Sequence, residues 1–291
     1  MPLPNETPLD IRLHAYRADL ADIALKDRVE AMHYVEPTHR RVTVPAADLK
    51  SAPDAASETA SQLLLGEEVA LFETRKDGWS WVQSHHDGYV GYVRSQDLTR
   101  RQGPAVSHRV VVPRTFVYPT ADMKTPPVMT VSAGSLLAIV GEETRRATRY
   151  GLLTDGKALI FDHLLEVGTP AHSDPVVIAS RFVESPYLWG GRSGFGLDCS
   201  GLVQLSFSLA GRQVLRDTDM QAGSIGRSVS DTGHYRRGDL IFWKGHVALV
   251  EDGDTLIHAN GRTMSVAREP IAAAIARIEP FYGRPIALRR S

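Results

Sequence analysis

The fold of the C-terminal part of the chain is decided by residues 187–211, which read YLWGGRSGFGLDCSGLVQLSFSLAG. After residue 201 this stretch is apolar and free of proline, and it stops at Gly211, a residue suited to the position that follows a helix. Asp198 is a good N-cap residue, because a carboxylate accepts the unpaired N–H groups of a first helical turn. The sequence therefore predicts a helix whose first turn carries Cys199.

Cys199 is the only cysteine in the sequence of 291 residues, which excludes an internal disulfide. A free cysteine is most often a buried, inert core residue. At the start of a helix, however, unpaired N–H groups and the helix dipole favour a thiolate, and the same N–H groups can face a developing oxyanion. Glycines just before Cys199 let a substrate backbone come close. This setting favours a nucleophile.

Two histidines, His246 and His258, fall in one predicted hairpin downstream of the thiol. A three-residue loop centred on Asp252 places them directly opposite each other, on one face of the hairpin. A two-residue loop would instead pair His246 with Ala259. We expect only the first register to give a catalytic pair, in which His246 takes the thiol proton and His258 orients its imidazole.

A metal site is the alternative use of one cysteine and two histidines, since zinc binds such a set with an open fourth position. The sequence has no close-spaced pair of these ligands and no His-Glu-x-x-His run. We therefore expect no metal and no other cofactor. The net charge of −1 gives no bulk attraction to nucleic acid, and no apolar run approaches the ~18 residues of a membrane span.

The remainder of the chain divides by its pattern of turns. Residues 1–48 are predicted to be an arm with short amphipathic helices around residues 19–32. Residues 49–105 are predicted to form an SH3-like barrel, because short apolar strands alternate with glycine turns. Residues 106–170 partly repeat that plan and are predicted to form a second, degenerate barrel, with a generic β module as the alternative. Residues 171–291 are predicted to form an α+β domain.

This C-terminal domain resembles the NlpC family of bacterial cell-wall cysteine peptidases. The residues that carry the resemblance are Tyr187, Trp189-Gly190-Gly191, Asp198-Cys199-Ser200-Gly201, Gly238-Asp239-Leu240, His246 and His258. The resemblance implies a papain-like fold and a triad of Cys199, His246 and His258. It also implies that Tyr187 lines the thiol side of the site and that Trp189, Asp198 and Ser200 contact substrate.

The whole layout resembles the SH3-containing γ-D-glutamyl-diamino-acid endopeptidases of muropeptide recycling. These cleave between D-Glu and meso-diaminopimelate or lysine in peptides with a free N-terminal L-Ala, and so release L-Ala-D-Glu. Asp217, eighteen positions after Cys199, matches the acidic residue that holds the L-Ala amine in that subgroup. A turn or helix cap is the other interpretation of Asp217. A barrel carboxylate and tyrosine also join the amine site there, for which the candidates are Glu67, Glu68, Tyr89 and Tyr92.

The expected partner is therefore a murein peptide, with no nucleic acid and no membrane insertion. The first residues lack the basic start and apolar core of a secretory signal, so we expect a cytoplasmic bacterial protein. An extracellular hydrolase of intact cell wall, a non-enzymatic wall-binding module and a thiol acyltransferase are the competing functions. The sequence leaves open the preference between diaminopimelate and lysine, and the oligomeric state.

Overall fold

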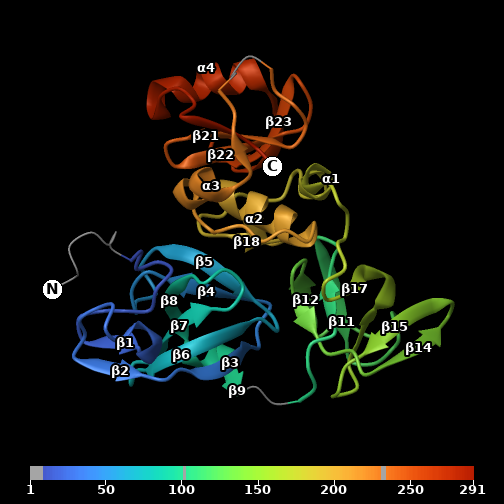
Figure 1. Cartoon of the computed structure of the whole chain (residues 1–291). Coiled ribbons are helices and arrows are strands. Elements are labelled where there is room, and N and C mark those ends of the chain that lie inside the picture. The colour runs from blue at the N-terminus through green and yellow to red at the C-terminus, as the bar shows by residue number, and fades with distance from the viewer. Residues whose placement is uncertain (1–8, 101–102, 231–233) are drawn as a thin grey trace. The chain divides into compact units, whose positions relative to one another are not determined.

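The computed structural model describes residues 9–100, 103–230 and 234–291 (Figure 1). The chain divides into two compact units, Met1–Val106 and Ser107–Ser291.

The first unit is built on one antiparallel sheet with the strand order β5-β4-β8-β7-β6-β3-β9. Its strands are β3 (Thr38–Val42), β4 (Ala46–Lys50), β5 (Thr59–Leu64), β6 (Glu68–Thr74), β7 (Trp79–Ser84), β8 (Val90–Arg94) and β9 (Leu98–Arg100). Gly78 and Gly88 have φ of 85° and 78°, the left-handed backbone that the predicted glycine turns require.

The segment before this sheet differs from the expectation in two ways. The predicted boundary at residue 48 falls inside β4, and β3 also pairs in the sheet, so the chain joins the barrel well before residue 49. The predicted amphipathic helices are wrong. Residues 19–35 instead form β1 (Leu20–Asp22), a short 3-10 turn (Ile23–Leu25) and β2 (His33–Val35), with β1 and β2 parallel. Helices this short are marginal in water, and strand pairing satisfies the same backbone groups.

The second unit begins with eight strands and one short 3-10 helix (Phe161–His163), over residues 108–166. The strands are β10 (His108–Val110), β11 (Arg114–Tyr118), β12 (Met129–Ser132), β13 (Leu136–Leu137), β14 (Gly141–Arg145), β15 (Thr148–Leu152), β16 (Ala158–Ile160) and β17 (Leu164–Glu166). They form two sheets, in the orders β13-β10-β17 and β12-β11-β16-β15-β14. Ser132 Oγ of this part accepts a hydrogen bond of 2.7 Å from the N–H of Gly194, so the strands support the loop that precedes Cys199.

The rest of the second unit is the mixed α and β domain that the sequence predicted. Its antiparallel sheet has the order β20-β25-β21-β22-β23-β24. The strands are β20 (Arg227–Ser228), β21 (Asp239–Trp243), β22 (His246–Val250), β23 (Thr255–Asn260), β24 (Ser265–Pro270) and β25 (Ala287–Arg290). A small hairpin of β18 (Arg192–Ser193) and β19 (Gly196–Leu197) precedes α2. The helices are α1 (Pro175–Ser180), α2 (Cys199–Leu209), α3 (Thr218–Ser224) and α4 (Ile271–Tyr282).

Helices α2 and α4 bury opposite faces of this sheet (Figure 1). Along β22, Val247 and Leu249 pack in the core that contains α2, whereas Ala248 and Val250 pack in the core that contains α4. This alternation follows from the two-residue period of a strand. It leaves the first turn of α2 next to the start of β22.

Candidate active site

Helix α2 begins at Cys199 as the sequence predicted. The Asp198 carboxylate caps it by accepting the Gly201 N–H at 2.6 Å, and Gly211 ends it with φ of 79°. Cys199 is buried, and its sulfur accepts hydrogen bonds from the backbone N–H groups of Ser200 and Val247. Since Val247 directly follows His246, the thiol lies beside the start of β22.

The thiol keeps its proton in the resting site. Burial raises the pKa of Cys199 to about 12, and the Asp198 carboxylate acts in the same direction. The two N–H groups and the Arg216 guanidinium oppose this rise without cancelling it. A nucleophile in this state needs a neighbouring base at the moment of attack.

The hairpin that carries the histidines has a different register from the predicted one. Leu249 pairs with Ile257, and Val250 pairs with Leu256, so the loop is centred on Gly253. The Asp252 carboxylate accepts the N–H groups of Asp254 and Thr255 at 3.0 and 2.8 Å, and this local turn moves the loop one residue along the chain.

The expectation that only one register would give a histidine pair was therefore wrong. Extending the observed register places His246 opposite Asn260, two residues beyond His258. A shift of two residues keeps a side chain on the same face of a strand. His246 Nε2 consequently lies 3.0 Å from His258 Nδ1.

Both imidazoles are neutral at pH 7 in this structure. Burial, together with the neighbouring His258, lowers the pKa of His246 to about 3. Burial also lowers the pKa of His258 to about 4. With Nε2 of His246 engaged by His258, Nδ1 is the atom of His246 that can take a proton from a thiol.

Sequence analysis missed an acidic residue behind this pair. Glu269, in β24, has Oε2 at 3.2 Å from His258 Nε2. Arg277 of α4 holds the same carboxylate through Nε and Nη2, at 2.9 and 2.6 Å. No local motif marks Glu269, because its position depends on the pairing of β24 with β23, in which it lies diagonal to His258.

Asp198 and Ser200 form a buried network with Arg216. Arg216 Nη1 donates to Asp198 Oδ1 at 3.0 Å and to Ser200 Oγ at 2.8 Å, and Nη2 donates to Asp198 Oδ2 at 2.7 Å. Asp198 also accepts the N–H of Gly190 at 3.0 Å. These side chains hold the first turn of α2 in place, and their expected contact with substrate stays a prediction.

Of the other residues predicted for the substrate site, Tyr187 lies near the thiol and Asp217 lies at the start of α3. Tyr187 is half-buried, and burial together with the nearby Cys199 raises its pKa. Trp189 is exposed at 59%. Asp217 occupies the N-cap position of α3, but its side chain makes no capping hydrogen bond. The cap interpretation of Asp217 is therefore not supported by a bond.

The barrel candidates are held within the first unit. Glu67 is buried, and its Oε2 accepts the Leu64 N–H at 2.8 Å. Glu68 pairs with Arg41 at 2.9 Å, and Tyr89 is buried. The Tyr92 hydroxyl accepts a hydrogen bond from Arg17 at 2.9 Å. A role for any of them in substrate binding stays a prediction.

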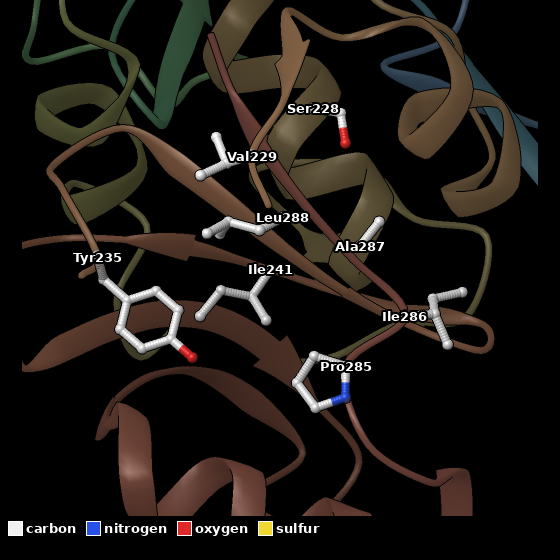
Figure 2. Close-up of a pocket in the computed structure, with 8 residues that line it drawn as sticks. All are labelled: Ser228, Val229, Tyr235, Ile241, Pro285, Ile286, Ala287 and Leu288. Atoms are coloured by element: carbon white, nitrogen blue, oxygen red, sulfur yellow. The ribbon is translucent and has the colours of Figure 1, made fainter. Parts of the chain in front are cut away.

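Within residues 9–100, 103–230 and 234–291, no group of three or more His, Cys, Asp or Glu side chains is arranged to hold a metal ion. No helix in the same described ranges is long and apolar enough to cross a membrane. Figure 2 shows a mostly apolar pocket over β21 and β25, which contains none of the predicted site residues. It is lined by Ser228, Val229, Tyr235, Ile241, Pro285, Ile286, Ala287 and Leu288.

A thiol at the start of a helix, packed against an antiparallel sheet that carries a histidine pair, defines a papain-like domain. The NlpC/P60 family matches residues 184–277, and the bacterial dipeptidyl-peptidase Sh3 domain matches residues 49–98. The chain belongs to the NlpC/P60 family and carries an SH3-like domain before the papain-like one.

Curated relatives and a solved structure match this chain over more than half of its length. Dipeptidyl-peptidase 6 of Lysinibacillus sphaericus is 26% identical over 231 residues, which cover 74% of this chain and 84% of the relative. Gamma-D-glutamyl-L-lysine dipeptidyl-peptidase of Bacillus cereus is 29% identical over 246 residues, which cover 74% of this chain and 72% of the relative. A probable endopeptidase of Corynebacterium glutamicum is 30% identical over 164 residues, which cover 54% of this chain and 74% of the relative.

The solved structure is that of an NlpC/P60 family protein from Bacillus cereus. It has a TM-score of 0.71 and 26% identity, and the alignment covers 87% of this chain and 99% of that one. The likeness therefore extends beyond the papain-like domain.

Proposed function

We propose that this protein is a cysteine endopeptidase that hydrolyses the γ-D-glutamyl-diamino acid bond of peptidoglycan-derived peptides with a free N-terminal L-Ala. The products are L-Ala-D-Glu and the diamino acid part of the peptide. The observation that carries the proposal is the buried Cys199 thiol at the start of α2, beside the strand on which His246 contacts His258. Relatives named dipeptidyl-peptidase 6 and gamma-D-glutamyl-L-lysine dipeptidyl-peptidase support the bond and the substrate class.

The acylation half of the reaction follows from the atoms at the site. His246 takes the thiol proton at Nδ1 while the sulfur attacks the γ-carbonyl carbon of D-Glu, and a C–S bond forms. His258 stabilises the resulting imidazolium through the contact between its Nδ1 and His246 Nε2. The first-turn N–H groups of α2 face the oxyanion. His246 then gives its proton to the leaving amine of the diamino acid as the C–N bond breaks.

Deacylation uses the same groups in reverse. Water attacks the thioester carbon, and His246 removes a proton from that water. The C–S bond breaks, the dipeptide leaves with its new carboxylate, and the proton returns to the sulfur. No redox partner or metal is needed for either half, since each step moves only protons and one acyl group.

The demand for a free amine is assigned to Asp217. An ammonium group paired with a carboxylate is bound strongly, whereas an acetyl or muramyl group removes the charge and adds bulk. Leaving a partly buried carboxylate without its cation costs several kcal/mol, enough for roughly 10²–10³-fold discrimination.

The test compares kcat/KM on L-Ala-γ-D-Glu-diaminopimelate, its N-acetylated form, the muramyl peptide and intact sacculi. We expect the free tripeptide to be preferred by about 10²-fold or more. Cys199→Ala should abolish hydrolysis, and a chelator should not. Asp217→Asn should lower the preference for the free amine, whereas Asp219→Asn, an exposed change in the same helix, should keep it.

Equal cleavage of blocked peptides, or better cleavage of sacculi, would replace this proposal with an extracellular wall hydrolase. Chelator inactivation reversed by zinc would replace the thiol mechanism. Two predictions go with the main proposal. Residues 106–170 are proposed to be a second SH3-like barrel, since the strands of residues 108–166 pair in two short sheets. The protein is proposed to act in the cytoplasm.

A further inference from the structure

The histidine pair continues into a series of polar contacts that involves four elements, β22, β23, β24 and α4. His246 of β22 contacts His258 of β23 at 3.0 Å, and His258 contacts Glu269 of β24 at 3.2 Å. Arg277 of α4 closes the chain with two bonds to Glu269, at 2.9 and 2.6 Å. His258 is 1% exposed, so water does not supply alternative partners for its ring.

These contacts decide which nitrogen of each imidazole carries the proton. A carboxylate only accepts hydrogen bonds, and Arg277 holds the pKa of Glu269 below its usual range, so Glu269 is ionised. His258 Nε2 lies 3.2 Å from this anion without completing a well-aligned hydrogen bond, and the negative charge favours a proton on Nε2, which leaves Nδ1 as an acceptor. His246 must then be protonated at Nε2, which leaves its Nδ1 bare.

A bare Nδ1 on His246 is the state that a general base for the thiol requires. In the opposite tautomer, His258 would donate from Nδ1 to His246 Nε2, and His246 would carry its proton at Nδ1. It would then have no lone pair for the thiol proton. The Glu269 carboxylate, at the end of this series of contacts, therefore sets the direction of every hydrogen bond between it and His246.

We infer that Glu269 is a positioning residue of the active site, held by Arg277, which fixes the tautomers of His258 and His246 so that His246 can act as a base. The inference rests on the proposed thiol mechanism and adds to it the group that sets the direction of the hydrogen bonds. Glu269 touches neither thiol nor substrate, and it acts only through His258.

The charges around the pair give the direction of the pH effects. They are Glu269 from β24, Arg277 from α4 and Arg262, whose Nη1 lies 3.5 Å from Glu269 Oε1, with the Cys199 thiol on the side of α2. Glu269 raises the pKa of both histidines, and Arg277 lowers it. Removing Glu269 should therefore destabilise the His246 imidazolium, and removing Arg277 should stabilise it.

The informative variant is Glu269→Gln, which keeps the size of the side chain. Arg277 has only donors and will bind the amide oxygen, so the amide NH₂ will face His258 Nε2. His258 must then accept there and donate from Nδ1, which reverses both tautomers. We expect kcat/KM for the free tripeptide to fall roughly 10²-fold, as for other carboxylates that orient a catalytic or metal-binding histidine.

A matched control exists in the same sheet. Glu251 and Arg268 form a second two-bond ion pair, at 2.7 and 2.9 Å, which touches neither histidine. Glu251→Gln should leave activity and pH profile unchanged. Arg277→Met is the second informative variant, because it should raise the pKa of His246 and move the acid limb of the pH profile to higher pH, while Glu269→Gln should move that limb to lower pH. Damage to the fold would not produce shifts of opposite sign.

Two measurements need no peptide substrate and so separate this inference from the proposed function. Imidazole ¹⁵N spectra at pH 7 should show His258 protonated at Nε2 in the wild type and at Nδ1 in Glu269→Gln. The pH dependence of Cys199 alkylation by iodoacetamide should show the same opposite shifts. Unchanged tautomers in Glu269→Gln, or shifts of the same sign in both variants, would overturn the inference even if the tripeptide is cleaved. If the tautomers reverse but no tripeptide is cleaved, the proposed function fails and the positioning role stands.

Discussion

Replacing Arg216 with methionine should destabilise the second unit and weaken the nucleophile. Arg216 is 1% exposed, and it makes three bonds of 2.7 to 3.0 Å to Asp198 and Ser200. Methionine keeps much of the apolar stem but removes the charge. The Asp198 carboxylate would stay buried, with only neutral donors such as the N–H groups of Gly201 and Gly190.

The magnitude follows from the burial of both partners. Breaking a buried ion pair by removing one partner costs about 3–5 kcal/mol, because the other charge is left uncompensated. Because N–H donors to Asp198 remain, we expect Arg216→Met to lower the free energy of unfolding by about 3 kcal/mol. In a domain of this size, that corresponds to a fall in Tm of about 6–12 °C. Arg216 also lowers the pKa of Cys199, so its loss should raise that pKa and slow alkylation at fixed pH.

The assay is chemical unfolding of the wild type and Arg216→Met, followed by iodoacetamide alkylation under native conditions. Arg268→Met is the control, since Arg268 is 46% exposed and its pair with Glu251 should be worth at most about 1 kcal/mol. If Arg216→Met lowers the free energy of unfolding no more than Arg268→Met does, the reasoning is refuted. Faster alkylation of the folded variant would also refute it.

Three further predictions concern the helix start and the histidines. Gly201→Ala should cost about 1–3 kcal/mol in denaturant unfolding, because an added Cβ would lie within 2.1 Å of the Gly191 oxygen, whereas Gly223→Ala meets nothing within 4 Å and should not destabilise. Acid should destabilise the wild type more than His258→Asn. In the folded protein the pKa values of His246 and His258 are about 3 and 4, whereas in the unfolded chain both protonate near pH 6.5. The free energy of unfolding should therefore fall as pH drops from about 6.5. Unfolding at pH 7 and pH 5 measures this, and equal losses in both proteins would contradict it. Finally, His246→Ala should lose nearly all peptidase activity, while His258→Asn should retain some, since an amide can also accept from an imidazole; near-wild-type rates for both would remove the pair from the mechanism.

The start of α2 could be predicted from the sequence because the interactions that define it are local. The Asp198 cap, the glycine at the helix end and the apolar run between them lie within fourteen consecutive residues, 198–211. The sequence also predicted that His246 and His258 share a face of the hairpin, although the register from which we derived this was wrong. Any even shift of a hairpin preserves the face, so the pair survives a displacement that the Asp252 turn imposes.

The sequence alone could not predict the register of the hairpin formed by β22 and β23. The stretch 251–254 offers two aspartates and a glycine, and each loop choice satisfies ordinary turn preferences. The outcome depends on which carboxylate accepts the free N–H groups of the loop, and on how the strands on both sides bury their apolar faces. Similarly, the placement of β3 and β4 in the first sheet depends on pairing partners far along the chain.

The sequence by itself determined the position of the lone cysteine at the start of its helix and the shared face of the two histidines, because each depends on a short run of neighbouring residues. Only the tertiary structure revealed Glu269, Arg277 and the buried Arg216, since these charges meet the site through strand order and helix packing. The physical reason is the range of the forces involved. Caps and turns act between residues a few positions apart, whereas a buried charge is fixed by whichever distant partner the fold brings to it.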